Sequence, residues 1–214
     1  MPWPVTHLLI SKKVFSKYFS HLDPEPFLIG TSFPDIRYPA SINRGITHFK
    51  NLPLFEIQSA DSFYAGLYFH CLVDHLWNIH LHQHNPVIFD QFPHNPPMIH
   101  TMKVLQDVYL YDRMADWQSI CRSFDRILPE ELQFGVSDKM VRLWHNTLAS
   151  YLRKPPEITD LEMLQVSLPA DMVERITQYY RIYHDHPVLR RIMQGFYEQI
   201  EPLITRFAAA DSMG

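Results

Sequence analysis

The sequence predicts an all-α protein. Apolar residues recur at the three- and four-residue spacing of helices in most long segments, and strand-like alternation between turn dipeptides is scarce. The chain holds 17 prolines but only 6 glycines, and the prolines gather at 24–39 and 86–97, where they mark loops. With 46% hydrophobic residues in a chain of 214, we expect residues 1–214 to fold as one multi-helix domain around a substantial core.

The helices can be placed in chain order from this spacing. We expect a first helix at residues 5–20 with Thr6 as its N-cap, then a short helix near 25–30 and an ordered, proline-rich loop. A long apolar helix should run from Ser59 or Ala60 to about His82. Residues 98–126 predict one or two helices.

Three further helices are expected at residues 137–153, 169–182 and 187–208, with Pro155, Pro156 and Pro187 as breaks. The C-terminal helices, in residues 121–214, are amphipathic, which favours packing. Covering a substrate mouth or forming a homodimer face are the alternatives for this half of the chain. The tryptophans Trp77, Trp117 and Trp144 are expected in the core. The histidines around the second proline cluster, at 86–97, are expected at the surface, and His100 is one of them.

Composition excludes several classes of protein. A formal charge of −4 gives no broad basic face for duplex nucleic acid. No segment offers about 18 uninterrupted apolar residues, so no transmembrane helix is expected. The start, "MPWPVTHLLISKK", lacks a basic segment followed by an apolar one, which argues against a secretory signal and for a cytoplasmic protein. In that compartment Cys71 and Cys121 are expected to be reduced thiols.

An ionisable pair interrupts the most apolar segment, "FYAGLYFHCLVDHLWN", at residues 63–78. His70 and Asp74 lie four residues apart, so a helix places them on one face. A buried carboxylate must be neutralised, paired or bound to a metal, because leaving it isolated is costly. The pair is therefore either a buried hydrogen-bonded pair or part of a site for zinc or a similar divalent ion.

Other segments supply residues of the same chemistry. Asp35 follows a proline in the constrained loop, and His48 comes thirteen residues later in "GITHFK". His7 is expected on the inner side of the first helix. Asp112 and Asp116 again lie four residues apart in an apolar segment, "VYLYDRMADW".

The order of these motifs resembles the zinc-dependent phospholipase C family, which shares its all-α fold with the fungal single-strand nucleases. The matching elements are Thr6-His7, Gly30 to Asp35 with one extra residue in the spacer, Thr47-His48-Phe49, and Gly66 to Asp74. Together they span about residues 5–120, the half that would carry the metal site. Residues 121–214 contribute nothing to the resemblance.

The resemblance implies a set of metal ligands. Asp35, His48, His70 and Asp74 would hold one zinc, and His7 would join a neighbouring ion with Asp74 bridging the two. The family completes a third site with a histidine six residues after that aspartate and a later His-x-x-x-Glu. His80 has the matching offset, and the pair Asp112 and Asp116 would replace the later residues, in a site better suited to Mg²⁺ or Mn²⁺.

The chain also departs from the family. The secreted enzymes bind metal through an N-terminal tryptophan, whereas Trp3 here follows Met1-Pro2. The family has a proline soon after the aspartate, but "DHLWNIH" contains none. On a regular helix His80 would therefore point about 120° away from Asp74, at 100° per residue.

The sequence thus predicts a metal-dependent hydrolase that acts on a phosphodiester or phosphomonoester with a metal-activated water. The resemblance makes Asp35 both a ligand and the candidate base toward that water, and Arg37 and Arg44 flank it as candidate phosphate-binding residues. The alternative is a non-catalytic helical domain, a binding or interaction module, in which a single metal only holds the fold.

Overall fold

The computed structural model describes residues 3–49, 52–158, 160 and 168–211, and within them all regular structure is helical, with no strand. The predicted all-α class is confirmed. The α-helices in chain order are α1 (Pro4–Tyr18), α2 (Pro24–Ser32), α3 (Arg37–Ala40), α4 (Arg44–Thr47), α5 (Leu54–Ser59), α6 (Ser62–Ile79), α7 (Ile88–Gln91), α8 (Pro96–Leu110), α9 (Trp117–Ser123), α10 (Pro129–Leu132), α11 (Asp138–Leu152), α12 (Ala170–Tyr183) and α13 (Pro187–Asp211). Short 3₁₀ helices at Phe33–Ile36 and Tyr111–Arg113 and a π-helical turn at His80–His84 complete the fold.

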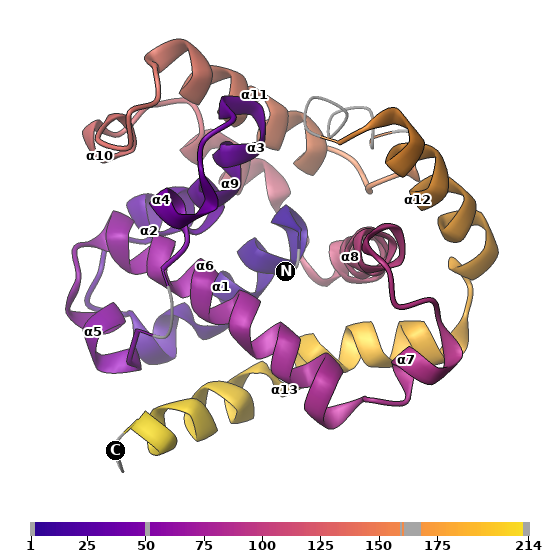
Figure 1. Ribbon diagram of the computed structural model, residues 1–214. Helices are drawn as coiled ribbons and strands as arrows, with labels where there is room; N and C mark the ends of the chain where they lie inside the picture. The colour runs from indigo at the N-terminus through magenta and orange to yellow at the C-terminus, as the bar shows by residue number, and fades with distance from the viewer. Residues whose placement is uncertain (1–2, 50–51, 159, 161–167, 212–214) are drawn as a thin grey trace.

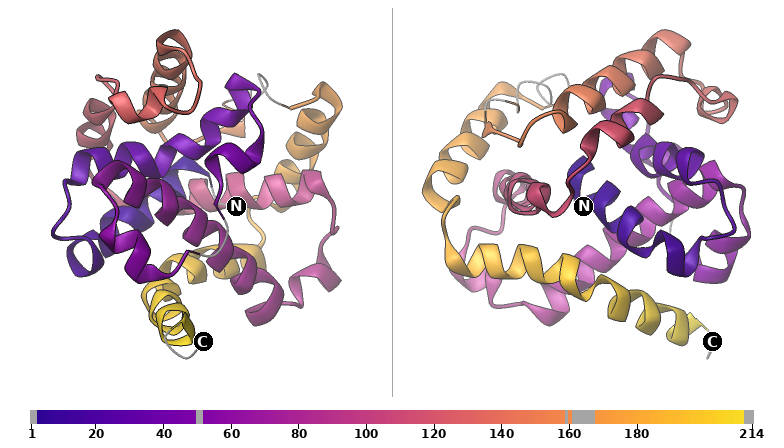
Figure 2. Two further views of the ribbon diagram at one scale, coloured as in Figure 1. Left: turned by 60° about the vertical axis from the view of Figure 1, so that its left-hand side comes forward. Right: turned by 180° about the vertical axis from the view of Figure 1, so that it is seen from behind.

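Helix α8 lies inside the molecule, with other helices around it. In Figure 1, α12 and α13 curve around it on one side, and the start of α1 lies beside it on the other. The two further views agree on this arrangement (Figure 2). The first turn of α1 is therefore an interior feature, and the residues that it carries lie near the centre of the protein.

The closest helix crossing joins α2 to α6 through two glycines. A Cβ atom on Gly30 would collide with the carbonyl oxygen of Phe63, and a Cβ atom on Gly66 would collide with that of Phe27. Only glycine permits this backbone approach. Since Asp35 follows α2 and His70 lies one turn after Gly66, the crossing brings the two predicted ligand segments together.

A side chain of α8 accepts hydrogen bonds from the free backbone N–H groups in the first turn of α1. The carboxylate of Asp107 accepts hydrogen bonds from the backbone N–H groups of Val5 (3.0 Å) and Thr6 (2.9 Å) and from the Thr6 hydroxyl (2.6 Å). The prediction of Thr6 as N-cap is wrong: Trp3 occupies that position, and Pro4 begins the helix. The helix is therefore capped by a carboxylate that is distant in the sequence, and not by the side chain of its own N-cap residue.

Two helix boundaries differ from the predicted ones. The long helix begins at Ser62, and its regular part ends at Ile79, after which the chain widens into the π-helical turn. The proline-rich segment after α2 is not a loop throughout, because it forms the 3₁₀ helix and the short helices α3 and α4. The three predicted C-terminal helices are present, with ends within a few residues of those expected.

Two apolar clusters form the core, and the C-terminal helices belong to them. Trp77, Trp117 and Trp144 are buried as predicted. Helix α13 packs its apolar face, including Phe196 and Ile204, into the cluster around α6 and α8. Both cysteines are free thiols. Among the described residues, no helix combines the length and the apolar character needed to cross a membrane.

Candidate metal centre

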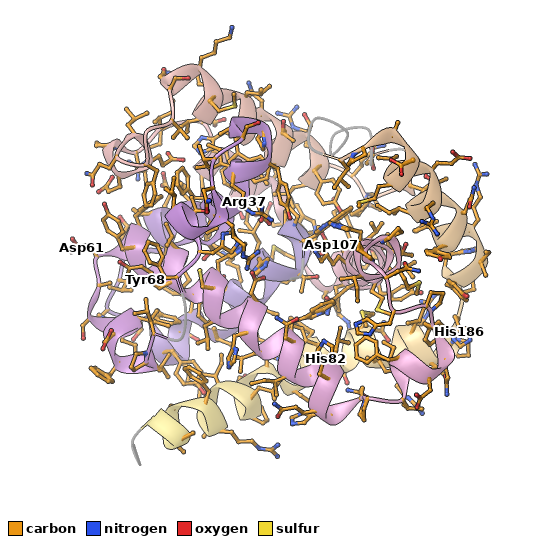
Figure 3. The ribbon with its side chains drawn as sticks, in the orientation of Figure 1. Arg37, Asp61, Tyr68, His82, Asp107 and His186 are labelled. Atoms are coloured by element: carbon orange, nitrogen blue, oxygen red, sulfur yellow. The ribbon has the colours of Figure 1, made fainter. Side chains whose placement is uncertain are left out.

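Five buried side chains from four separate elements meet beside the start of α1. His7 comes from α1, Asp35 from the first 3₁₀ helix, His48 from the end of α4, and His70 and Asp74 from α6. None of the five residues is more than 8% exposed. Figure 3 labels Arg37 and Asp107, and nitrogen atoms of several side chains gather in the interior between them.

Asp74 lies at the middle of this group, and its two oxygens face different histidines. Oδ1 lies 3.4 Å from Nε2 of His7, whereas Oδ2 lies 3.7 Å from Nε2 of His48 and 3.8 Å from Nε2 of His70. One carboxylate therefore connects two sets of nitrogen atoms. This is the arrangement that a bridging carboxylate needs.

Two overlapping sets of ligand atoms are compact enough for a cation. One set consists of Asp35, His48 and His70, the other of His7, His70 and Asp74, and in each set the ligand atoms lie within 4.8 Å of one another. His48 and His70 also approach edge to face, with ring centroids 5.2 Å apart. The structure thus brings side chains of all five residues into two overlapping candidate groups.

In His48 and His70, the Nδ1 nitrogen, which points away from Asp74, has a hydrogen-bond partner. Nδ1 of His70 lies 2.8 Å from the carbonyl oxygen of Thr31, which can only accept, so Nδ1 carries the hydrogen. The Thr47 hydroxyl donates to the carbonyl oxygen of Pro34 at 3.0 Å, and it therefore accepts from Nδ1 of His48, also at 3.0 Å. Both rings consequently present the lone pair of Nε2 to the interior. Histidines that bind metal are held in this way by a second hydrogen bond.

His7 is held by stacking instead. Its ring lies parallel to that of His70, with centroids 3.9 Å apart and 7° between the planes. Neither ring nitrogen of His7 has a hydrogen-bond partner among the described residues. The 3.4 Å separation from Asp74 brings the two groups together without a hydrogen bond.

Several of the polar atoms that face this interior lack partners. Within the described part of the chain, Nε2 of His48, Nε2 of His70, Oδ1 of Asp35 and Oδ1 of Asp74 are buried without a hydrogen bond. Buried polar atoms are nearly always satisfied, since each orphaned group costs about 1–3 kcal/mol. So many orphaned ligand atoms in one place indicate a ligand that accepts lone pairs from all of them.

The protonation states suit a cation. Burial, together with the neighbouring His70, lowers the pKa of His7 to about 4 and the pKa of His48 to about 3, so both imidazoles are neutral at pH 7. Burial would raise the pKa of the Asp35 and Asp74 carboxyls, but the neighbouring imidazoles, His70 foremost, lower it below its ordinary value in both. Neutral imidazoles and ionised carboxylates are the ligand forms that divalent metals require.

The ligand atoms are spaced more widely than they would be around a tetrahedral ion. Ligands at about 2.0–2.1 Å from a zinc ion lie roughly 3.3 Å from one another in tetrahedral geometry. The nitrogen-to-oxygen separations of 3.7–3.9 Å around His48 are a little longer than that. Other ligand atoms in the two sets lie up to 4.8 Å apart, so each set would have to contract around an ion, while the types of ligand fit the zinc that the resemblance implies.

Both predicted arginines lie against the carboxylates. The guanidinium group of Arg44 donates to Oδ2 of Asp74 at 3.3 Å, while its side chain is 46% exposed. Nε of Arg37 lies 4.0 Å from Oδ1 of Asp35, and its guanidinium group stacks on the ring of Tyr38. Arg44 thus connects the buried carboxylate to the protein surface.

The structure does not bring the predicted third set of ligands to this centre. His80 lies in the π-helical turn, where its Nε2 donates to the carbonyl oxygen of Ile192 on α13. Asp112 is exposed, and Asp116 caps α9 by accepting from the N–H group of Ser119. Asp112 and Asp116 do not lie on one regular helix, because α8 ends at Leu110, a 3₁₀ helix covers Tyr111–Arg113, and residues 114–116 are not helical.

Three residues of α8 next to the centre were missed by the sequence reasoning. Lys103 and Asp107 are buried, and His100, expected at the surface, is half-buried with its Nδ1 buried and unpartnered among the described residues. The available signal was a charged pair within the apolar run "MIHTMKVLQDVYL". Trp3 packs edge to face on Tyr151 in the core.

Comparisons of this chain with protein-family models, with curated proteins and with solved structures found no match. The resemblance to the zinc-dependent phospholipase C family therefore rests on the short motifs and their order.

Proposed function

We propose that this chain is a metal-dependent hydrolase of a phosphate ester. One observation carries the proposal: five buried side chains from four elements turn unpartnered nitrogen and oxygen atoms toward one another. The order of their motifs, which resembles that of the zinc-dependent phospholipases C, supports zinc as the ion and a phosphate ester as the substrate.

The residues of the chain would have three roles: holding the metal, accepting a proton and orienting the substrate. Asp35, His48, His70 and Asp74 would hold one divalent ion, and His7 would hold a second together with Asp74. A divalent ion in such a site polarises a phosphoryl oxygen and lowers the pKa of a bound water. Oδ1 of Asp35 has no hydrogen-bond partner among the described residues, so it is available to accept the proton of that water. Arg37 and Arg44 would orient the anionic substrate.

A second candidate function is a structural metal. The burial of all five ligand residues favours it, because structural zinc sites are closed whereas catalytic ones keep an open position. The half-exposed guanidinium of Arg44 on the central carboxylate favours a catalytic metal, since it places an anion-binding group between the centre and the protein surface.

The decisive experiment measures metal content and hydrolysis in the same samples. Purified protein is analysed for bound metals, treated with a chelator, reloaded, and assayed on a panel of chromogenic phosphate monoesters and diesters. Asp74→Asn should lose both metal and hydrolysis. Asp112→Asn is the matched control, because this exposed carboxylate lies outside the centre, and it should retain both.

The outcomes separate the two candidates. Bound metal with metal-dependent hydrolysis supports the proposed enzyme. Bound metal without hydrolysis of any ester in the panel supports the structural metal. A protein that binds no divalent ion would overturn both.

A further inference from the structure

Helix α8 contains a buried lysine that no carboxylate pairs. Lys103 is 5% exposed, and among the described residues its ammonium group forms no hydrogen bond or ion pair and keeps only a small contact with solvent. Lysine is rarely buried unless it is paired, because desolvating an ammonium group is costly. An unpaired ammonium in this position indicates an anionic ligand that is not part of the chain.

The position of Lys103 on α8 directs it toward the candidate metal centre. It lies one helical turn before Asp107, on the same face of α8. Asp107 holds the first turn of α1, immediately before His7. The ammonium group of Lys103 is therefore placed near the first turn of α1, where the candidate ligands converge.

The charges that act on Lys103 come from the same centre. Burial lowers the pKa of Lys103, Asp35 and Asp74 oppose that change, and Arg37 and Arg44 add to it. His100, three residues earlier on α8, belongs to the same group: burial and the charge of Lys103 lower its pKa to about 3, so its ring is neutral.

Among the described residues, the charged side chains of this region balance without a metal. Lys103, Arg37 and Arg44 are cationic, and Asp35, Asp74 and Asp107 are the carboxylates. A divalent ion held by Asp35 and Asp74 would leave an excess of positive charge. A phosphate monoester carries close to two negative charges at neutral pH, whereas a diester carries one. The monoester matches this excess better.

We propose that Lys103, from α8, and Arg37 and Arg44, from α3 and α4, bind a dianionic phosphate group, so that the substrate is a phosphate monoester. His100, three residues before Lys103 on α8, has a buried ring nitrogen without a partner among the described residues. This inference rests on the proposed hydrolase function and narrows it to one class of ester. Lys103 acts as a substrate-binding residue, and no metal is assigned to it.

The test measures the binding of inorganic phosphate by titration calorimetry, with and without loaded metal. Lys103→Met keeps the length of the side chain and removes its charge, and phosphate affinity should fall about tenfold or more. Metal content should be unchanged. Lys139→Met is the matched control, because Lys139 is an exposed lysine on α11, and it should bind phosphate as the wild type does.

Stability gives an independent readout. Lys103→Met removes a buried charge that has no partner, so the melting temperature of the ligand-free protein should rise, while the further rise on adding phosphate should shrink. Lys103→Gln is a second variant in case Met packs badly. Hydrolysis of a monoester should fall more than hydrolysis of a diester in both variants.

The failure of this inference can be told from the failure of the hydrolase proposal. Unchanged phosphate affinity in both Lys103 variants, or a wild type that prefers diesters, would overturn the phosphate site while leaving metal and hydrolysis in place. A protein without metal or hydrolysis that still binds phosphate through Lys103 would overturn the hydrolase and support the anion site.

Discussion

The protein buries two groups of histidine and carboxylate side chains, and they differ in how their polar atoms are satisfied. In the first group, Glu131 and His145 form a 2.8 Å contact, Glu131 also accepts from the N–H group of Leu128, and the other ring nitrogen of His145 faces the carbonyl oxygen of Phe124. The second group, the candidate metal centre, leaves many of its inward-facing nitrogen and oxygen atoms without partners among the described residues.

The difference indicates which buried group serves the fold and which serves a ligand. A closed network contributes to stability and to a single packing arrangement, because each polar atom has exchanged water for a protein partner. An unsatisfied network destabilises the chain alone and is stabilised when a ligand binds. Both groups are buried and both combine imidazole with carboxylate, so these two features do not separate them, whereas the hydrogen-bond pattern does.

The largest expected loss of stability comes from breaking the buried pair of Glu131 and His145. Glu131→Gln leaves His145 next to a neutral group, and removing one partner of a buried pair costs about 3–5 kcal/mol. We expect the free energy of unfolding in urea to fall by roughly that amount, with bound metal unchanged per folded molecule. Asp138→Asn is the control, because it breaks an exposed pair with Arg142 on the same helix and should cost less than about 1 kcal/mol. Loss of metal in Glu131→Gln would contradict the distinction.

The candidate metal centre should give the metal-free protein a pH dependence to which His7 contributes. The pKa of His7 is about 4 in the folded protein, against an ordinary value of 6.5. The unfolded chain therefore binds this proton at a higher pH than the folded chain does. The stability that neutral His7 contributes is complete above pH 6.5, falls as the pH drops toward 4, and changes little below that.

The measurement is the difference in unfolding free energy between the wild type and His7→Gln, both with chelator, from pH 7 to pH 4. We expect the wild type to lose on the order of 3 kcal/mol relative to the variant, at 1.36 kcal/mol per pKa unit. The difference is needed because burial raises the pKa of Asp107 to about 7, which makes the contribution of that carboxyl change in the opposite direction. A difference that stays constant with pH would show that His7 is not a buried neutral ring.

Asp107 has hydrogen-bond partners for both of its oxygens, and it also positions the turn of α1 that precedes His7 of the candidate metal centre. In the wild type, the Asp107 oxygens accept from the Val5 and Thr6 N–H groups and from the Tyr151 hydroxyl. Asp107→Asn replaces one of these oxygens with an NH₂ group, which is a donor and faces at least one of these donors. We expect a loss of about 1–3 kcal/mol in stability. Metal affinity, measured by competition with a chromogenic chelator, should fall about tenfold, because His7 follows the displaced turn. Wild-type metal affinity in this variant would show that α1 is positioned by other contacts.

How far the sequence predicts the fold depends on how local the signal is. Helical spacing and proline breaks are local, and they placed α11, α12 and α13 well. The N-terminus of α1 was misplaced because its capping group, Asp107, is 101 residues from Thr6 in the chain. The end of α6 was extended too far because the widening at His80 depends on a contact with α13.

The candidate site follows the same rule. His7, Asp35, His48, His70 and Asp74 share short motifs, and the structure brings them together. His80, Asp112 and Asp116 were chosen by offset alone, and tertiary packing placed them elsewhere. Lys103 was not found, although Lys103 and Asp107 are two charged residues in an apolar run, because their place beside the candidate metal centre depends on the packing of α8 against α1.

The smallest expected effect concerns the hydroxyl that holds His48. Thr47→Val keeps the shape of the side chain but removes the oxygen that accepts from Nδ1 of His48 and donates to Pro34. The ring then loses the partner that keeps the lone pair of Nε2 directed inward. We expect about tenfold weaker metal binding, as is typical when a group that supports a metal-binding histidine is lost, and a stability loss near 1 kcal/mol.

The matched control for this variant is Thr31→Val. It removes a hydroxyl that donates to the carbonyl oxygen of Phe27, yet the main-chain oxygen that accepts from His70 remains. Its stability should therefore fall by a similar amount while its metal affinity stays at the wild-type value. Titration of both variants with zinc against a competing chelator compares them directly. Equal metal affinities would mean that the Thr47 hydroxyl only supports packing, whereas weaker binding in Thr47→Val alone would assign it to holding the ring that faces the metal centre.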